Sequence, residues 1–357
     1  MNINQDHPEN LQFDLDDLIS IVLPVYNAGQ FIEPCLLSIS SQTHRMFEAI
    51  IVDDGSDDET PSILNRFASQ DSRFKTIRFE QNRGIVAALN EGLAQSKGDW
   101  IARMDADDQM QPNRLQMQFD YMSSHPEIDL LGARIQLFRL EGSLSPGQLK
   151  YQNWSNSLLT DDQIKENFFA ESPIMHPTFF AKRGLYEKLG GYQDPPWPED
   201  YDFLFRAYLN GARFEKIPEV LVLKGDHPDR LARTDERCKR TAMFNAKIHY
   251  FQKLFPKILD RDLVIVGTGS AGKMVFEAFQ KESVQIAAFM THQIKGKKAE
   301  FKDVPIYTVS QDNPINQIKL DHPFYLLCIG FDEARDEVES LFQKSDLLPC
   351  RDYLRFI

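Results

Sequence analysis

Short apolar runs alternate with amphipathic stretches through the first third of the chain. Each run stops at polar residues, which is typical of a strand buried on both faces of a parallel sheet. Between the runs, apolar residues recur at helical spacing, as Ile63, Leu64 and Phe67 do. The predicted strands are 19–23, 49–52, 75–79 and 100–104, and the predicted helices between them are 30–41, 60–68 and 84–95. The alternation predicts an α/β fold with a mostly parallel sheet covered by helices.

The pattern is less regular in the middle of the chain and becomes regular again near its end. Helices are predicted at 113–122, 182–189, 200–210 and 234–255, and residues 140–160, with their Gly, Ser, Pro and Asn, are predicted to be an excursion over the surface. Strands predicted at 263–266, 286–289 and 324–329 indicate a second βαβ unit. We therefore predict a flexible arm over 1–17, a large α/β domain over 18–257 and a small Rossmann-like α/β domain over 258–357.

Composition excludes several classes of protein. The chain has 357 residues, 42% of them hydrophobic, which is too many for a disordered protein. With 40 basic and 53 acidic residues its net charge is −13, so we expect no nucleic-acid partner. The four cysteines form no Cys-x-x-Cys pair, which disfavours a zinc knuckle and a disulfide framework. Without a long apolar run or a signal peptide, the protein is expected to be cytoplasmic.

Polar residues follow each of the first four predicted strands. In open α/β sheets, ligands bind outside the carboxyl ends of the strands. The strand-end residues are Pro24, Val25, Tyr26 and Asn27, then Asp53 and Asp54, then Asn82, Arg83 and Gly84, and finally Asp105, Ala106, Asp107 and Asp108. This set suits a nucleoside diphosphate, because one carboxylate can accept a hydrogen bond from a base N–H and an acidic cluster can hold a divalent cation.

The acidic cluster contains three carboxylates within four residues, Asp105, Asp107 and Asp108. Such groups repel one another unless they are solvated or share a hard cation. An isolated Asp-x-Asp is most often a solvated turn. The position of this cluster directly after an apolar strand favours the cation site.

These motifs resemble those of the family 2 glycosyltransferases with the GT-A fold. The resemblance covers residues 18–250 and rests on motifs in a fixed order: 21–27 (IVLPVYN), 52–60 (VDDGSDDET), 82–84 (NRG) with 89–92 (LNEG), and 101–108 (IARMDADD). Residues 176–178 (HPT), 190–192 (GGY), 198–202 (PEDYD) and 226–228 (DHP) are similar to acceptor-side motifs of bacterial members that build surface polysaccharides.

The resemblance implies an inverting, metal-dependent transfer of a hexosyl group. The donor would be a nucleotide sugar, with a UDP-sugar favoured, and the acceptor a hydroxyl of a saccharide or of a lipid-linked acceptor. A single displacement needs a base for the acceptor proton and an electrophile for the leaving diphosphate. Asp200 is the predicted base and Glu199 the second choice. The alternative for Asp200 is a carboxylate that satisfies backbone N–H groups at a helix start.

The resemblance also implies roles for the donor-binding residues. Asp107 is the predicted direct metal ligand, Asp105 binds the metal through water or contacts the ribose, and Asp108 could do either. His227 could complete a shell for Mn²⁺ or Mg²⁺, and an imidazole suits Mn²⁺ better. Asp53 would read the base. The predicted nucleotide-sugar site contains Pro24, Val25, Tyr26, Asn27, Asp53, Asn82, Arg83, Gly84, Asp105, Ala106, Asp107, Arg230 and Arg233, the two last as diphosphate clamps.

The roles of three further side chains stay open. Arg83 could pair with a phosphate or be a surface arginine. On the acceptor side, His176 could line the acceptor pocket or be a hydrogen-bonded core residue, and Trp197 could stack on a sugar ring or pack in the core.

The C-terminal segment carries the spacing Gly267-x-Gly269-x-x-Gly272 between a predicted strand and a predicted helix. This pattern is a candidate phosphate loop of the dinucleotide-binding type. The acidic residue expected after the next strand is missing at 289–292, which disfavours NAD. The segment resembles small Rossmann-like domains found on some sugar-modifying acyltransferases and appended to some bacterial glycosyltransferases. It could bind a nucleotide, dock a partner or serve as a scaffold.

Two other functions compete with sugar transfer. The protein could act as a nucleotide-binding or oxidoreductase-like protein through residues 258–357, or as a catalytically inactive sugar-nucleotide-binding module. The basic residues of the predicted helix 234–255 could meet the inner face of an anionic membrane, or form a solvated helix face. The donor sugar, the acceptor and the oligomeric state are not predicted from this sequence.

Overall fold

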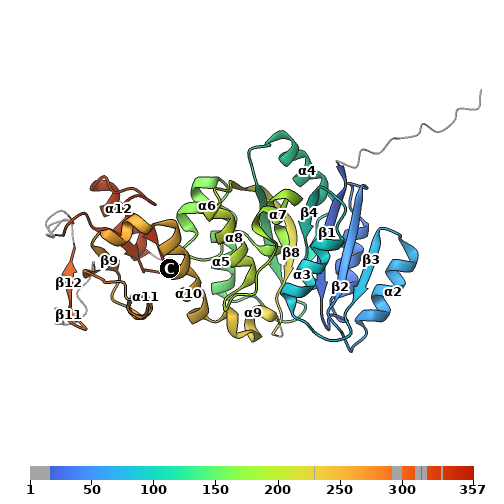
Figure 1. The fold of residues 1–357 in the computed structure, drawn as a ribbon, viewed down its shortest axis with the longest axis horizontal. Helices are drawn as coiled ribbons and strands as arrows, with labels where there is room; N and C mark the ends of the chain where they lie inside the picture. Colours follow the sequence, from blue (N-terminus) through green and yellow to red (C-terminus); the bar gives the residue numbers. More distant parts are fainter. Residues whose placement is uncertain (1–16, 229, 292–299, 310–314, 316–319, 331–332) are drawn as a thin grey trace, which may run out of the picture. The chain divides into compact units, whose positions relative to one another are not determined.

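The computed structural model describes residues 17–228, 230–291, 300–309, 315, 320–330 and 333–357 (Figure 1). The chain divides into two compact units. The first unit comprises Met1–Leu131, His176–Gly191 and Val220–Gly225, and the second comprises Gly132–Met175, Tyr192–Glu219 and Asp226–Ile357.

The strands and helices of the first three quarters of the chain match the predicted α/β alternation. Its strands are β1 (Ile19–Val25), β2 (Phe47–Asp53), β3 (Phe74–Arg78), β4 (Trp100–Arg103), β5 (Gln109–Met110), β6 (Leu130–Phe138), β7 (Phe180–Lys182) and β8 (Phe214–Gly225). Its helices are α1 (Ile32–Ser40), α2 (Thr60–Gln70), α3 (Ile85–Gln95), α4 (Arg114–Ser124), α5 (Pro146–Ser157), α6 (Asp161–Asn167), η2 (His176–Thr178), α7 (Arg183–Leu189), α8 (Glu199–Leu209), α9 (Leu231–Thr234), η3 (Glu236–Cys238), α10 (Arg240–Leu254) and η4 (Pro256–Asp260).

The large sheet has eight strands in the order β3-β2-β1-β4-β7-β6-β8-β5. Strand β1 pairs in parallel with β2 on one side and with β4 on the other, and β3 continues the parallel part (Figure 1). Every residue of β1 and β2 is buried, because both faces of this part of the sheet are covered. The carboxyl ends of β1, β2 and β4 therefore lie at one edge of the sheet, where ligands of such folds bind.

The short strands β5 and β7 are antiparallel to their neighbours. Strand β7 pairs with β4 and β6, and β5 pairs with β8. The mostly parallel sheet that the sequence predicts is thus confirmed for β1 to β4, while these two additions have two and three residues and leave no periodic signal of their own.

The predicted surface excursion over residues 140–160 contains a helix that the sequence does not predict, α5 (Pro146–Ser157). Ser145 accepts a hydrogen bond from the backbone of Gln148, and the side chain of Gln148 bonds back to the backbone of Ser145. This capping box, with Pro146 in the first turn, starts the helix despite its polar composition. The segment is largely exposed, as predicted, with only Ser155 of the helix fully buried.

The second sheet lies in the C-terminal part of the second unit. Its strands, β9 (Leu263–Val266), β10 (Ala288–Thr291), β11 (Glu300–Phe301), β12 (Val304–Thr308), β13 (Phe324–Leu327) and β14 (Tyr353–Arg355), have the order β11-β12-β10-β9-β13-β14. All neighbours are parallel except β11, and the helices α11 (Ser270–Lys281) and α12 (Glu333–Lys344) connect parallel strands. His292, at the end of the strand predicted there, lies outside the described residues.

The glycine motif before α11 has a backbone explanation. Gly267 has a φ of +118°, and a Cβ on Gly272 would lie 2.0 Å from the carbonyl oxygen of Gly267. Only glycine fits this tight turn from β9 into α11. A Cβ on Gly269 would meet nothing within 4 Å, so the turn itself does not require the middle glycine.

None of the helices in the described ranges combines the length and the apolar composition that a membrane crossing requires.

Candidate active site

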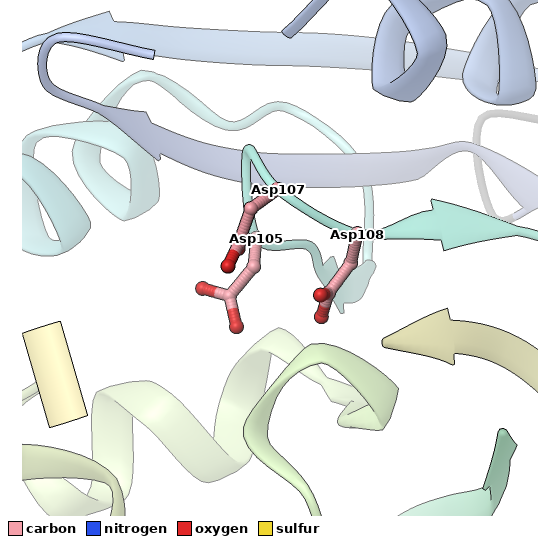
Figure 2. A group of neighbouring side chains, drawn as sticks. All are labelled: Asp105, Asp107 and Asp108. Carbon is pink, nitrogen blue, oxygen red and sulfur yellow. The ribbon is translucent and has the colours of Figure 1, made fainter. Parts of the chain in front are cut away.

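The three predicted metal-binding carboxylates project to the same side of the turn between β4 and β5 (Figure 2). Asp105, Asp107 and Asp108 each offer one oxygen, and these oxygens all lie within 4.8 Å of one another. Asp105 and Asp107 are half-buried and Asp108 is fully buried. The first unit therefore brings together the acidic cluster that the sequence predicts.

Asp108 is held by the strand that pairs with β5. Its Oδ1 accepts the backbone N–H of Gly225 at 2.8 Å, and its Oδ2 lies 3.3 Å from Nζ of Lys224. The antiparallel register pairs Gln109 with Leu223, which brings the end of β8 beside the acidic turn. A Cβ on Gly225 would lie 2.3 Å from the carbonyl oxygen of Asp107, so a glycine is needed for this close approach.

Asp105 contacts two cations. It forms an ion pair with Arg103, and its Oδ2 lies 3.3 Å from Nζ of Lys224. Arg103 is 2% exposed, and its carbonyl oxygen accepts a hydrogen bond of 2.9 Å from Nη2 of the buried Arg114. Asp105 and Asp108 thus lie beside two buried positive charges, those of Arg103 and Lys224.

The cluster fits a divalent cation. Carboxylate oxygens are the ligands that Mg²⁺ and Mn²⁺ prefer, and Asp105 and Asp107 are the members with solvent access. Asp108 has both oxygens engaged by Lys224 and Gly225, so it anchors the turn.

Cys35 of α1 contacts the backbone of the acidic turn, and the sequence does not predict this contact. Its buried Sγ donates a hydrogen bond of 3.3 Å to the carbonyl oxygen of Asp105. Burial, and then the negative charge of Asp108 and its neighbours, raises the pKa of the Cys35 thiol. The thiol therefore stays protonated and able to donate.

His176, predicted on the acceptor side, belongs to the same unit. It is 6% exposed, and the edge of its ring meets Phe179 with the ring centroids 4.9 Å apart. Burial first, and then the positive charge of Arg103, lowers its pKa well below the usual value. His176 is therefore a neutral imidazole at physiological pH.

The predicted base-reading residue, Asp53, ends β2 opposite Val25 of β1. Its Oδ1 accepts the backbone N–H of Ser56 at 3.0 Å. Its Oδ2 is buried without a hydrogen-bond donor, and Nε of Arg78 lies 3.5 Å away. A carboxylate oxygen that lacks a donor is able to accept an N–H from a ligand.

The residues after β1 are fixed by the loop after β2. Asn27 has a φ of 47°, and its backbone N–H donates to Oγ of Ser56 at 2.9 Å, while its Oδ1 accepts the N–H of Asp57 at 3.0 Å. Tyr26 is 50% exposed beside this loop. Pro24 and Val25 are buried in β1 and are available only through their backbone.

Asp54 organises the third strand-end loop, a role that the sequence does not predict. Its carboxylate accepts the backbone N–H of Arg83 at 2.6 Å and that of Gly84 at 2.9 Å, and Asn82 Oδ1 also accepts the N–H of Gly84. The guanidinium of Arg83 lies over the ring of Phe79, 4.4 Å from its centroid. The Asp54 carboxylate and the Asn82 side-chain amide thus hold the loop before α3 by accepting its backbone N–H groups.

The predicted base lies in the second unit, at the start of α8. Oδ1 of Asp200 accepts the N–H of Tyr201 at 2.7 Å. The carboxylate therefore makes the contact with the helix start that is the alternative to a catalytic role. Glu199 is buried and precedes it in the first turn. Both roles are compatible, because this hydrogen bond fixes the orientation of the carboxylate.

Asp202 anchors the start of α8. It accepts hydrogen bonds from Nε1 of Trp197 at 2.9 Å, from the hydroxyl of Tyr250 at 2.7 Å and from Nε of Arg206 at 2.7 Å. Trp197 also packs against His249 with the ring centroids 5.1 Å apart. The half-buried indole is therefore held in a fixed orientation.

Asp226 gathers the predicted phosphate clamps. Arg139 Nε and Arg233 Nη2 each lie 2.5 Å from its carboxylate, and Arg230 Nη1 lies 3.9 Å away. Burial acts to raise the pKa of Asp226, but the hydrogen bonds and the arginine charges outweigh it and lower the pKa. His227 follows in the same loop and is half-buried.

Comparison with known proteins identifies the family. The profile of glycosyl transferase family 2 matches residues 20–190. An uncharacterized glycosyltransferase of Methanocaldococcus jannaschii is 30% identical over 245 residues, which cover 66% of this chain and 80% of that protein. This chain belongs to glycosyltransferase family 2.

Two further similarities describe the fold and the length of this family 2 glycosyltransferase. An uncharacterized glycosyltransferase of Haemophilus influenzae is 33% identical over 209 residues, and the match spans 57% of this chain and 64% of that protein. A crystal structure of S. aureus TarS in complex with UDP has a TM-score of 0.51 and 18% identity, and covers 66% of this chain and 65% of that one. The GT-A fold is thereby confirmed.

Proposed function

We propose that this family 2 protein is an inverting glycosyltransferase that moves a sugar from a nucleotide donor to a hydroxyl acceptor. The observation that carries the proposal is the convergence of three carboxylates after β4, two strands from the unsatisfied Oδ2 of Asp53 after β2. The strand β1 lies between them and ends at the same edge. One parallel-strand edge thus carries an acceptor for a base N–H and a cluster for a cation.

The donor half of the proposal assigns roles within the first unit. Asp53 accepts an N–H of the base, with uracil favoured, and the exposed ring of Tyr26 packs on it. A divalent cation, held by Asp107 and Asp105, would neutralise the diphosphate leaving group. The neutral His176 can donate or accept a hydrogen bond near the sugar without adding charge.

The acceptor half assigns the proton transfer to Asp200. In a single displacement the acceptor hydroxyl attacks the anomeric carbon, its proton passes to the Asp200 carboxylate, and the bond to the diphosphate breaks. Trp197 would pack on a sugar ring, and Arg230 and Arg233 would bind the diphosphate. We propose a saccharide or lipid-linked hydroxyl in cell-surface polysaccharide or glycolipid synthesis as the acceptor.

The metal-dependent donor site is tested by isothermal titration of the full chain with UDP, with and without Mn²⁺. Binding that strengthens with Mn²⁺ is expected, and Asp53→Leu should weaken it because the base loses its acceptor. UDP binding that is indifferent to Mn²⁺ would contradict the metal-dependent mechanism.

The base assignment predicts that Asp200→Asn lowers kcat by about 10²–10⁴-fold, the usual contribution of a general base. The amide keeps an oxygen for the Tyr201 N–H, so folding and UDP affinity should not change. Transfer rates with a panel of UDP-sugars and simple acceptors provide the measurement, and Glu199→Gln is the comparison. If Asp200→Asn retains full transfer, the base is another residue.

A further inference from the structure

Lys224 contacts the acidic cluster but belongs to none of the strand-end motifs. Its Nζ lies 3.3 Å from Oδ2 of Asp105 and 3.3 Å from Oδ2 of Asp108. The residue is 6% exposed. An ammonium group therefore lies inside the cluster, between two of its three carboxylates.

The position of Lys224 is fixed by the backbone on both sides. Strand β8 pairs with β5 up to Leu223 and Gln109, and the N–H of Gly225 donates to Asp108. The end of β8 also packs closely against the turn, because a Cβ on Gly225 would lie 2.3 Å from the carbonyl oxygen of Asp107. The ammonium group can therefore leave the cluster only if the side chain of Lys224 changes its conformation.

A buried ammonium here changes how the cluster meets a divalent cation. Together with Arg103 it supplies positive charge beside the carboxylates, which lowers their mutual repulsion when no metal is bound. A cation that binds to Asp105 or Asp108 must compete with the ammonium for the same oxygens and is repelled by it. Like charges at such separations repel one another in a partly buried site, which should weaken the affinity for the cation about tenfold or more.

A diphosphate reverses this balance. Its negative charge gives both the cation and the ammonium a further partner, so the repulsion between them is offset when the donor is present. Metal binding and donor binding then strengthen each other.

We propose that Lys224 is a positioning residue that acts as a built-in counter-cation, keeping the resting cluster weak for divalent cations and making tight metal binding depend on the donor diphosphate. The inference rests on the proposed nucleotide-sugar function. It adds Lys224 to that site and gives a physical reason why binding of the donor diphosphate should strengthen binding of the metal.

The test measures Mn²⁺ binding to the full chain by titration calorimetry and by loss of the free Mn²⁺ signal in electron paramagnetic resonance. Mn²⁺ is titrated alone and at saturating UDP. Lys224→Gln removes the charge and keeps a hydrogen-bond donor for the buried carboxylates, whereas Lys224→Arg keeps the charge. Lys97→Met is the matched control, because Lys97 is an exposed lysine of the same unit without a contact to the cluster in the described structure.

In the unaltered protein and in Lys97→Met, UDP should strengthen Mn²⁺ binding about tenfold or more. In Lys224→Gln, Mn²⁺ alone should bind about tenfold more tightly than in the unaltered protein, and the gain from UDP should shrink to a few-fold. Lys224→Arg should behave like the unaltered protein. A melting temperature recorded for each variant confirms that it is folded.

Two outcomes overturn the inference and are distinguishable. If UDP strengthens Mn²⁺ binding in the unaltered protein and equally in folded Lys224→Gln, with no gain for Mn²⁺ alone, the role of Lys224 is wrong and the proposed function stands. If the unaltered protein does not bind Mn²⁺ even with UDP, the metal-dependent function fails and the inference fails with it. Should Lys224→Gln not fold, Lys224→Met with the same readouts decides between these outcomes.

Discussion

The three aspartates of the acidic turn differ in what surrounds them. Asp108 is fully buried between Lys224 and the N–H of Gly225, whereas Asp107 is half-buried on the same side of the turn. The sequence alone gives no reason to assign Asp107 and Asp108 different roles, because they are adjacent members of the same acidic cluster. Burial makes Asp108 an anchor of the fold and leaves Asp107 accessible from solution as the proposed metal ligand.

This difference predicts opposite effects of two alanine substitutions. Asp108→Ala should lower the free energy of unfolding by about 3 kcal/mol, because it leaves the buried Lys224 ammonium short of a partner. Asp107→Ala should change it by less than about 1 kcal/mol and should abolish metal-dependent UDP binding. Urea unfolding and calorimetry of both variants provide the measurement. Equal destabilisation by the two substitutions would contradict the assignment of Asp108 as anchor.

Residues predicted from the sequence and residues missed by it differ in a physical way. Asp53 and Asp105 come directly after apolar strands, so the strand-end rule finds them. Lys224 and Cys35 reach the same site through an antiparallel register and a helix face, and neither contact is encoded in local spacing. The sequence shows Lys224 only as a basic residue between the apolar residues 220–223 and the motif 226–228, which does not predict a contact with the acidic cluster.

At the scale of elements, strand β8 carries a second buried lysine. Nζ of Lys216 donates to the carbonyl oxygens of Ser155 and Pro173, the latter at 2.7 Å, and so ties α5 to β8. Burial lowers the pKa of Lys216 to about 7. The same side chain is close to Gly132, where a Cβ would lie 2.9 Å from its Cγ.

The lowered pKa of Lys216 predicts a pH dependence of stability. The unfolded lysine titrates near its usual value of about 10.4, so between about pH 7 and pH 10 the unfolded state binds more protons than the folded state. The free energy of unfolding should therefore rise with pH across that window through this group, and its contribution is lost below pH 7. Lys216→Met should flatten the rise, as measured by urea unfolding at several pH values. Exposed Lys97→Met should keep it, and parallel profiles for all three proteins would refute the assignment.

Among the elements, those with a long periodic pattern are predicted and the short or capped ones are not. Strands β1 and β2 and helix α2 have apolar positions that agree with their burial, whereas in α3 only Ala88, Leu89 and Gly92 are buried. Helix α5 depends on its capping box instead, and the predicted helix 234–255 is divided at Asp235, whose side chain accepts from the N–H of Arg237. Local hydrogen bonds of this kind compete with periodicity.

At the scale of the molecule, aromatic rings join the C-terminal sheet to the rest of the second unit. Phe356 stacks on Phe169 with the ring centroids 5.7 Å apart and meets Phe251 and Phe279. Nζ of the buried Lys247 donates to the carbonyl oxygens of Ala170 and Phe356. We propose that residues 258–357 act as a scaffold or docking domain, since the backbone of the turn before α11 itself explains Gly267 and Gly272.

The aromatic contacts predict that Phe356 stabilises the whole second unit. Phe356→Ala should lower the free energy of unfolding by about 3–5 kcal/mol, the usual cost of removing a buried aromatic ring. Leu348→Ala, at a residue that is 50% exposed, should change it by about 0.5 kcal/mol or less. A single cooperative transition that shifts only in Phe356→Ala is expected in chemical unfolding. Two separate transitions with Phe356→Ala affecting only one would show that the C-terminal sheet folds independently.

The closure of the acidic turn by β8 also sets an order of events during synthesis. Lys224 and Asp105 are 119 residues apart in sequence, and Asp108 is 117 residues from Gly225. Strands β1 to β4 can pair as soon as they leave the ribosome, but the turn after β4 carries three carboxylates without Lys224 until β8 has emerged. We therefore expect a nascent chain to pass through a stage in which these carboxylates lack the Lys224 ammonium, and arrival of β8 ends that stage.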